Sequence, residues 1–333
     1  MDKTLSKTFD LLRFPLAVMV VYLHIDAMPT IKVLDFNWCN IDGSPLYYIV
    51  TILVFKIAAL AVPCFFVMSG YLLFVNIQEL SISVYISKIR RRIKTLLIPY
   101  FIWNLLAVVY LYVTQDVVFD NWSPIFLAPA NFPLWFMRDL IFMTFLFPVF
   151  YWVVKLLGIY GAIILSIVYL CGIIPDRGIC YFSSIFFFYI GCFWGIRRIQ
   201  LPIIKSSSVY LLFYSIILIV AFVLYGSIEG QYWNRIYLMI GVFIVFVISY
   251  NEMLKRDIKI FSLLASASFF IYVSHKLGFT YLSKLLFNYL PSNYYVLTLQ
   301  FLVAPCIAVG LCLFVYFYIK KYCPKLLFIT GGK

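Results

Sequence analysis

Histidine and charged side chains are scarce in this sequence. Its 333 residues include two histidines, and Lys, Arg, Asp and Glu together make up 12%. Soluble domains carry about 25% charged residues, so the composition excludes a soluble globular protein. The eight cysteines form neither a Cys-x-x-Cys pair nor a Cys/His cluster, so no zinc or iron–sulfur site is indicated. We therefore expect no metal.

Apolar residues dominate what remains. They make up 65% of the chain, and the mean hydropathy is +1.02. A helix needs about 20 apolar residues to cross a bilayer, so we expect an all-α, polytopic membrane protein with about ten transmembrane helices and one domain, 1–333. The predicted spans are 10–28, 47–75, 94–114, 134–156, 158–174, 181–199, 208–226, 235–250, 261–287 and 295–319.

The basic residues predict how these spans are oriented. With a cytoplasmic N-terminus and ten spans, 19 of the 26 Lys and Arg residues fall on the cytoplasmic side and six on the other. Cytoplasmic loops are enriched in Lys and Arg, so both termini are expected inside. This bias explains the net charge of +13 without nucleic acid, which is not an expected partner.

Helix geometry then assigns a depth to the polar residues. In FDLLRFPLAVMVVYLH, Phe9 to His24, the histidine lies about 22 Å above the cytoplasmic end, and His275 lies about 21 Å above the start of span 261–287. Arg13 precedes His24 by eleven residues, close to three turns, so the two share one helix face. Arg138 and Asp139 enter span 134–156 from outside and are expected in the same outer layer as the histidines.

Each of these residues also has a simpler interpretation. Arg13 can be a cytoplasmic anchor, His24 an interfacial histidine, and Arg138 with Asp139 a structural ion pair. Ionisable groups within a membrane are costly and mark functional pathways by default, and four of them converge on one layer. Lys56, about 15 Å into its span, can extend to the interface or pair with a carboxylate; the candidates are Asp10, Asp26 and Asp139.

Two histidines in an apolar layer suit a narrow range of chemistry. A neutral imidazole can act as a general base on a hydroxyl group. A basic cytoplasmic entrance suits a phosphate-bearing cofactor. Together these features predict acyl transfer from a cytoplasmic thioester to a hydroxyl.

Four local motifs resemble the acyltransferase-3 family of bacterial membrane O-acyltransferases, in its single-domain branch. FDLLRFPLAVMVVYLH is similar to the family's Arg-x10-His signature. The other similar segments are VPCFFVMSGYLLF (62–74), KIRRRIKTLLIPYFIW (88–103), and PLWFMRDL (133–140) with SASFFIYVSH (266–275). The likeness covers residues 9–320. The chain departs from the family's Arg-x-x-Arg loop, with Lys88-x-x-Arg91 and Arg91-x-x-Lys94 instead, and lysine cannot make bidentate phosphate contacts.

The resemblance implies an O-acetyltransferase in the bacterial cytoplasmic membrane. Acetyl-CoA would be the donor, and a cell-surface glycan or lipid-linked sugar the acceptor. His24 would be the general base or a transient acyl carrier, and His275 a second acid/base or an acceptor-binding group. Asp10 or Asp139 would orient the imidazole, because Asp26 faces away from His24 on a helix. The CoA phosphates would be held by basic residues, namely Arg13, Arg91, Arg92 and Lys94.

Other polar and aromatic residues have less defined roles. Trp135, Arg138, Asp139 and Ser69 are expected to bind acceptor or cofactor, although Ser69–Gly70 is explained more simply by close helix packing. Five aromatic residues can stack on sugar or form the interfacial aromatic belt; they are Trp38, Trp122, Trp135, Tyr181 and Trp233.

Two other function classes stay open at this point. A polytopic protein with intramembrane charge can be a transporter or flippase of a lipid-linked sugar or small solute, or a structural subunit of an envelope complex. Transporters often carry internal repeats, and none is evident here. The sequence predicts no oligomeric state.

Overall fold

The described residues of the computed structural model form helices and connecting segments, with no strand among them. These residues are 2–24, 45–115, 123, 127–176, 180–224, 228–256, 258, 260–279, 289–290 and 293–331. The α-helices are α1 (Lys3–Leu23), α2 (Pro45–Ala58), α3 (Ala61–Phe74), α4 (Ile82–Arg92), α5 (Ile98–Gln115), α7 (Trp135–Phe145), α8 (Phe147–Cys171), α9 (Phe182–Arg197), α10 (Ser207–Val223), α11 (Ile228–Lys255), α12 (Ser262–Ser274), α14 (Tyr294–Tyr322) and α15 (Pro324–Thr330). Two π-helical turns, η2 (Ile93–Leu97) and η4 (His275–Phe279), and one 3₁₀ turn, η3 (Phe132–Leu134), complete them.

The all-helical character is confirmed for the described residues, and their helices suggest a multi-pass membrane protein. Within the described residues, five helical stretches are long and apolar enough to cross a bilayer: Ile52–Phe74, Ile82–Thr114, Phe147–Cys171, Glu229–Lys255 and Tyr295–Tyr322. Their surfaces carry many exposed large apolar side chains, as expected where lipid replaces water. The predicted number of ten crossings and the cytoplasmic position of both termini stay predictions.

Proline and glycine divide two predicted spans into shorter helices. The run 47–75 breaks between α2 and α3, two residues before Pro63, which has no N–H to bond the carbonyl of residue 59. The run 134–156 breaks at Leu146, and Pro148 occupies the first turn of α8. A kink at Gly158 (φ 52°, ψ −124°) then interrupts α8, close to the predicted boundary between 134–156 and 158–174.

Three other helical segments differ in extent from the predicted membrane spans. Helix α1 begins at Lys3 instead of residue 10, because the Asp2 carboxylate caps it by accepting from the Thr4 N–H at 3.1 Å. The basic segment before span 94–114 forms α4 and η2 rather than a loop. The short run 235–250 is the middle of the 28-residue α11.

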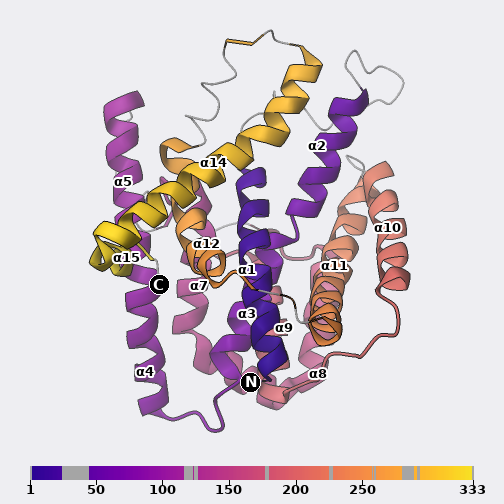
Figure 1. Ribbon diagram of the computed structural model, residues 1–333. Helices are drawn as coiled ribbons and strands as arrows, with labels where there is room; N and C mark the ends of the chain where they lie inside the picture. The colour runs from indigo at the N-terminus through magenta and orange to yellow at the C-terminus, as the bar shows by residue number, and fades with distance from the viewer. Residues whose placement is uncertain are drawn as a thin grey trace.

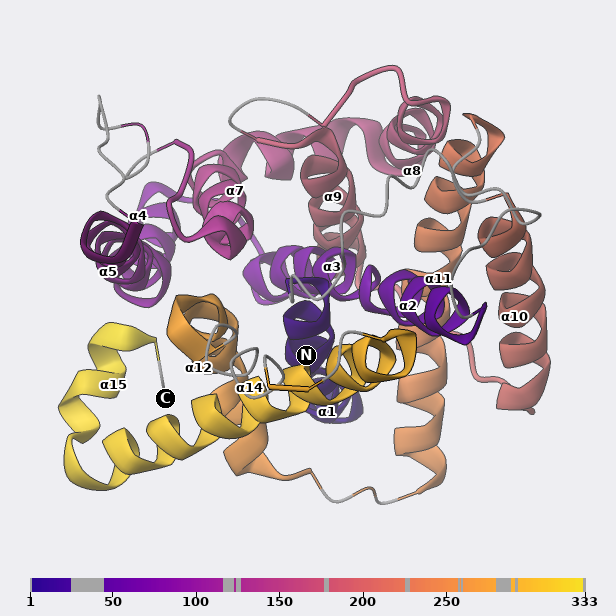
Figure 2. The same ribbon diagram turned by 90° about the horizontal axis from the view of Figure 1, so that it is seen from above.

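Helix α1 occupies the centre of the bundle. Figures 1 and 2 show it surrounded by α2, α3, α11, α12 and α14, and each of these helices packs against it. Helices α5, α10 and α15 lie at the periphery in Figure 2. The end of α1 therefore brings His24 to a point where several helices meet.

The closest helix contact joins α3 to α9. A Cβ atom added to Gly70 would lie 2.3 Å from the Phe188 carbonyl oxygen, and one added to Gly191 would lie 2.1 Å from that of Val67. Only glycine permits backbones to approach this closely. The simpler interpretation of Ser69–Gly70, helix packing, is thus supported for Gly70.

Candidate active site

The two histidines lie against each other. The ring centroids of His24 and His275 are 5.3 Å apart, with 54° between the ring planes. His24 is the C-cap of α1, and His275 starts η4 directly after α12. The two histidines lie side by side although 21 residues of α1 precede His24 and 13 residues of α12 precede His275. The depth of the pair in the membrane stays a prediction.

Backbone carbonyls fix the orientation of both rings. Nδ1 of His24 lies 2.8 Å from the Val20 oxygen, and Nδ1 of His275 lies 2.8 Å from the Tyr272 oxygen and 3.1 Å from that of Ile271. A carbonyl oxygen only accepts, so in each neutral ring Nδ1 carries the hydrogen. The lone pair that can take up a proton is then on Nε2 in both histidines.

The segment before α7 forms one wall of this histidine pair. The Phe132 ring lies 5.9 Å from the His24 ring and is 60% exposed. Asn131 donates from Nδ2 to the Val273 oxygen at 3.0 Å, and the Tyr272 hydroxyl donates to the Pro133 oxygen. His275 is fully buried while His24 is half-buried, so the pair has an open and a closed side.

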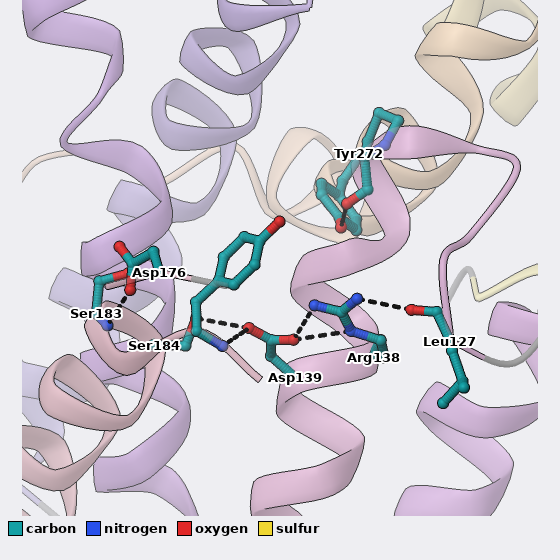
Figure 3. Close-up of polar contacts among 9 residues, drawn as sticks. Leu127, Arg138, Asp139, Asp176, Ser183, Ser184 and Tyr272 are labelled. Carbon is teal, nitrogen blue, oxygen red and sulfur yellow. Dashed lines mark hydrogen bonds and ion pairs between the residues drawn. The ribbon is translucent and has the colours of Figure 1, made fainter. Parts of the chain in front are cut away.

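Arg138 and Asp139 form a separate, saturated cluster. Arg138 donates from Nε and Nη2 to Asp139 Oδ1 at 3.0 and 2.7 Å, and from Nη1 to the Leu127 oxygen at 2.7 Å. Asp139 Oδ2 accepts from the Tyr181 N–H at 3.1 Å and the Ser184 hydroxyl at 2.8 Å. Figure 3 shows Asp139 between Arg138 and Ser184. The bonds from Asp139 to Tyr181 and Ser184 connect α7 to α9. This geometry is the one expected of a structural ion pair.

The predicted orienting carboxylates are occupied elsewhere. Asp10 pairs with Arg13 at 2.6 Å within α1, and fourteen residues of continuous helix place it about 21 Å below His24. Both oxygens of Asp139 are bonded within its own cluster. The structure therefore does not bring Asp10 or Asp139 to the imidazole; the Val20 carbonyl holds Nδ1 of His24 instead. Asp26 lies outside the described residues.

Arg13 lies on a largely buried face of α1 and is itself partly exposed. Its side chain is 36% exposed, although Phe9 and Leu16 on the same face are 1% exposed. The Asp10–Arg13 pair is exposed on both partners and leaves part of the guanidinium available. An exposed arginine below a histidine pair, on one helix face, fits the predicted path for an anionic donor.

The other predicted cofactor and substrate residues lie on α3, α4, η2 and α7. Arg91, Arg92 and Lys94 belong to α4 and η2, which pack against each other, and α4 also packs against α7. Trp135 lies at the start of α7, with its ring 5.0 Å from that of Tyr181. Ser69 is half-buried on α3. The roles of these residues stay predictions, and Trp38 and Trp122 lie outside the described residues.

Lys56 has a partner that the sequence did not suggest. Its Nζ donates to the Asn234 side-chain oxygen at 2.6 Å, and the side chain is buried between α2 and α11. A cavity of about 590 Å³ lies at the other end of the molecule, where the ends of α1, α3 and α9 meet Tyr250 of α11. Arg198 and Gln200 line it, and neither was predicted to have a role.

Sequence reasoning also missed Asn104 and Asn131. Asn104 is fully buried in α5, and its side-chain oxygen accepts from the Asn131 N–H at 3.1 Å. A single amide within the apolar run FIWNLLAVV is the signal that marks Asn104, because an amide buried there needs a hydrogen-bond partner. Asn131 has no such local signal, since its contacts are with residues far away in sequence.

Two comparisons of the sequence with known proteins found matches. The model of the acyltransferase-3 family, described as an acyltransferase domain, matches residues 7–318. The chain is 27% identical over 165 residues to the succinoglycan biosynthesis protein ExoH of Rhizobium meliloti (strain 1021). That match covers 44% of this chain and 43% of the relative, less than half of each. No solved structure matches significantly.

The family match includes the elements that carry Arg13, His24 and His275. It extends over nearly the whole helical bundle, so it does not depend on one motif. This chain belongs to the acyltransferase-3 family.

Proposed function

We propose that this protein is a membrane O-acyltransferase that transfers an acetyl group from cytoplasmic acetyl-CoA to a hydroxyl of a cell-surface or lipid-linked glycan. The observation that carries the proposal is the contact between His24 and His275, with Nδ1 of each ring held by backbone carbonyls. Family membership supports acyl transfer, and the partial match to a succinoglycan biosynthesis protein supports a glycan acceptor.

The chemistry requires one base and one leaving group. Nε2 of His24 takes the proton of the acceptor hydroxyl while its oxygen attacks the thioester carbonyl carbon. The C–O bond forms and the C–S bond breaks as the intermediate collapses. CoA leaves as the thiolate and takes a proton, so the products are the O-acetyl ester and free CoA thiol. His24 is ready for the next cycle once it has returned its proton.

Arg13 is the residue on this face that suits the anionic end of the donor. Three turns separate Arg13 from His24, about 16 Å along the helix, so a donor held at Arg13 extends towards the imidazole. A guanidinium binds phosphate oxygens in bidentate fashion. In this arrangement the donor stays at the end of the bundle that holds the N-terminus, while its thioester meets the histidine pair.

A donor assay tests the proposal. Purified protein in detergent receives acetyl-CoA or succinyl-CoA together with non-acylated surface polysaccharide from cells that lack the gene. We expect release of CoA thiol with acetyl-CoA, and a polysaccharide mass increased by acetyl groups. Turnover of succinyl-CoA alone would contradict acetyl transfer. Turnover of neither donor, combined with unchanged polysaccharide in the deletion strain, would refute the acyltransferase assignment.

A further inference from the structure

Asn131 is held rigidly while one of its polar atoms is unused. Its backbone N–H donates to Asn104, its backbone oxygen accepts from the Leu134 N–H at 2.9 Å, and its Nδ2 donates to Val273. Because the Val273 oxygen only accepts, the amide nitrogen must face it, and Oδ1 must point away. Oδ1 is buried and has no hydrogen-bond partner among the described residues. Such a buried acceptor requires an explanation.

His275 shows the same pattern from the neighbouring helix. Its Nδ1 hydrogen is used by backbone carbonyls, and its Nε2 is buried without a partner in the described part of the chain. The unused atom is therefore a lone-pair acceptor, like Asn131 Oδ1. An orphaned buried acceptor loses its hydrogen bonds to water without replacement, which is unfavourable.

The two unused acceptors belong to one small region. Asn131 bonds the carbonyl of Val273, two residues before His275. Phe132, the residue after Asn131, packs its ring against His24, which itself contacts His275. The Phe132 ring is largely exposed, so this region reaches the surface of the bundle next to the two buried atoms. Two acceptors beside the base match a ligand with several O–H donors.

We propose that Asn131 Oδ1 and His275 Nε2 form a subsite that accepts hydrogen bonds from hydroxyl groups of the acceptor sugar, next to the hydroxyl that His24 deprotonates. The ligand class is a polyol with neighbouring hydroxyls. This inference rests on the proposed function. It assigns Asn131 a binding role and gives His275 substrate binding rather than proton transfer.

Separate KM values for the two substrates test the subsite. The probes are acetyl-CoA and the non-acylated polysaccharide from the deletion strain. Asn131→Ala is expected to raise the polysaccharide KM about tenfold, which corresponds to ~1.4 kcal/mol, while the acetyl-CoA KM changes by less than about twofold. His275→Asn keeps a side-chain N–H for the backbone carbonyl but has no Nε2, so it is expected to raise the same KM.

Asn251→Ala is the matched control. Asn251 is also buried, but its side chain is fully used by the Ile204 N–H and the Pro202 and Val247 oxygens. This variant is expected to lower Tm and leave both KM values unchanged. If Asn131→Ala fails to fold, the polysaccharide KM of His275→Asn decides whether the subsite exists.

Two outcomes contradict the inference in different ways. Unchanged polysaccharide KM in a folded variant, with wild-type transfer intact, would mean that the two atoms hold only a structural water, and would overturn the subsite alone. Absence of transfer by the wild-type protein would overturn the proposed function itself.

Discussion

Two polar centres lie in this apolar bundle, and they differ in what they leave unused. In the Arg138–Asp139 cluster both carboxylate oxygens and all three guanidinium nitrogens are bonded within the protein. In the histidine pair the Nδ1 atom of each ring bonds a backbone carbonyl, and His275 Nε2 is buried without a partner among the described residues. The first arrangement joins helices, whereas the second leaves one buried acceptor, His275 Nε2, that we propose binds substrate.

The comparison teaches that depth in a membrane protein does not identify a catalytic group. Both centres were expected in the same outer layer, and both contain ionisable residues from that layer. What separates them is whether each donor and acceptor is satisfied by the protein. The following variants are ordered from the largest expected effect to the smallest.

His24→Asn tests the reactive centre most directly. Asparagine retains an N–H that can donate to the Val20 oxygen but lacks Nε2. Loss of a general base typically lowers kcat by about 10²–10⁴-fold, and we expect an effect in this range for thiol release from acetyl-CoA. Tm is the control and is expected to stay near the wild-type value. A kcat within about tenfold of wild type would contradict the role of His24 as base.

Asp139→Asn tests the saturated centre. It leaves the half-buried Arg138 without its anionic partner, and breaking a buried ion pair typically costs about 3–5 kcal/mol. We expect a large fall in the free energy of unfolding and in the amount of protein in membranes. A stable variant with a raised polysaccharide KM would instead support the substrate-binding role predicted for Arg138 and Asp139.

Ser184→Ala sharpens the structural interpretation with a smaller change. It removes one hydrogen bond to the Asp139 carboxylate, and bonds to charged groups contribute about 1.5–3 kcal/mol. Thermal unfolding is expected to show this loss, with kcat unchanged. Ser166→Ala is the matched control, because the Ser166 hydroxyl bonds only a carbonyl of its own helix. Equal effects of the two substitutions would show that the bond to Asp139 has no special importance.

Arg13→Ala contrasts the exposed ion pair with the buried one. Exposed pairs contribute about 0–1 kcal/mol, so stability is expected to change little. The acetyl-CoA KM is expected to rise about tenfold, which is ~1.4 kcal/mol, through loss of phosphate contacts. The acetyl-CoA KM of Arg13→Lys is expected to lie between those of the wild type and Arg13→Ala, since lysine keeps the charge but lacks the planar guanidinium. An unchanged acetyl-CoA KM would show that Arg13 is only a membrane anchor.

Helix rise and the direction of each span predicted a common layer for His24 and His275, but not the contact between their rings. Both quantities are local, so sequence carries them. Hydropathy also located the helical regions, but it did not locate the breaks before Pro63 and Pro148, because apolar runs continue across them. Hydropathy is averaged over a window of residues. A helix break depends instead on a single proline, which lacks the backbone N–H that the helix needs at that position.

Partners distant in sequence were not predictable in this way. Lys56 donates to the side-chain oxygen of Asn234, which is 178 residues away, and Asn131 bonds Val273, which is 142 residues away. Asp10 was one of two carboxylates expected to orient the His24 imidazole, but the length of α1 separates it from His24 and it pairs with Arg13. Such pairings depend on how helices pack, and the packing follows from the whole set of contacts.

The glycine contact between α3 and α9 has a consequence for motion. Backbones that touch at Gly70, Gly191 and Gly195 cannot approach further, and sliding them would drive carbonyl groups together. Helices α3 and α9 therefore behave as one stiff unit, which also carries Ser184. If the bundle opens to admit an acceptor sugar, as we propose, we expect the movement to lie in segments other than this α3–α9 contact.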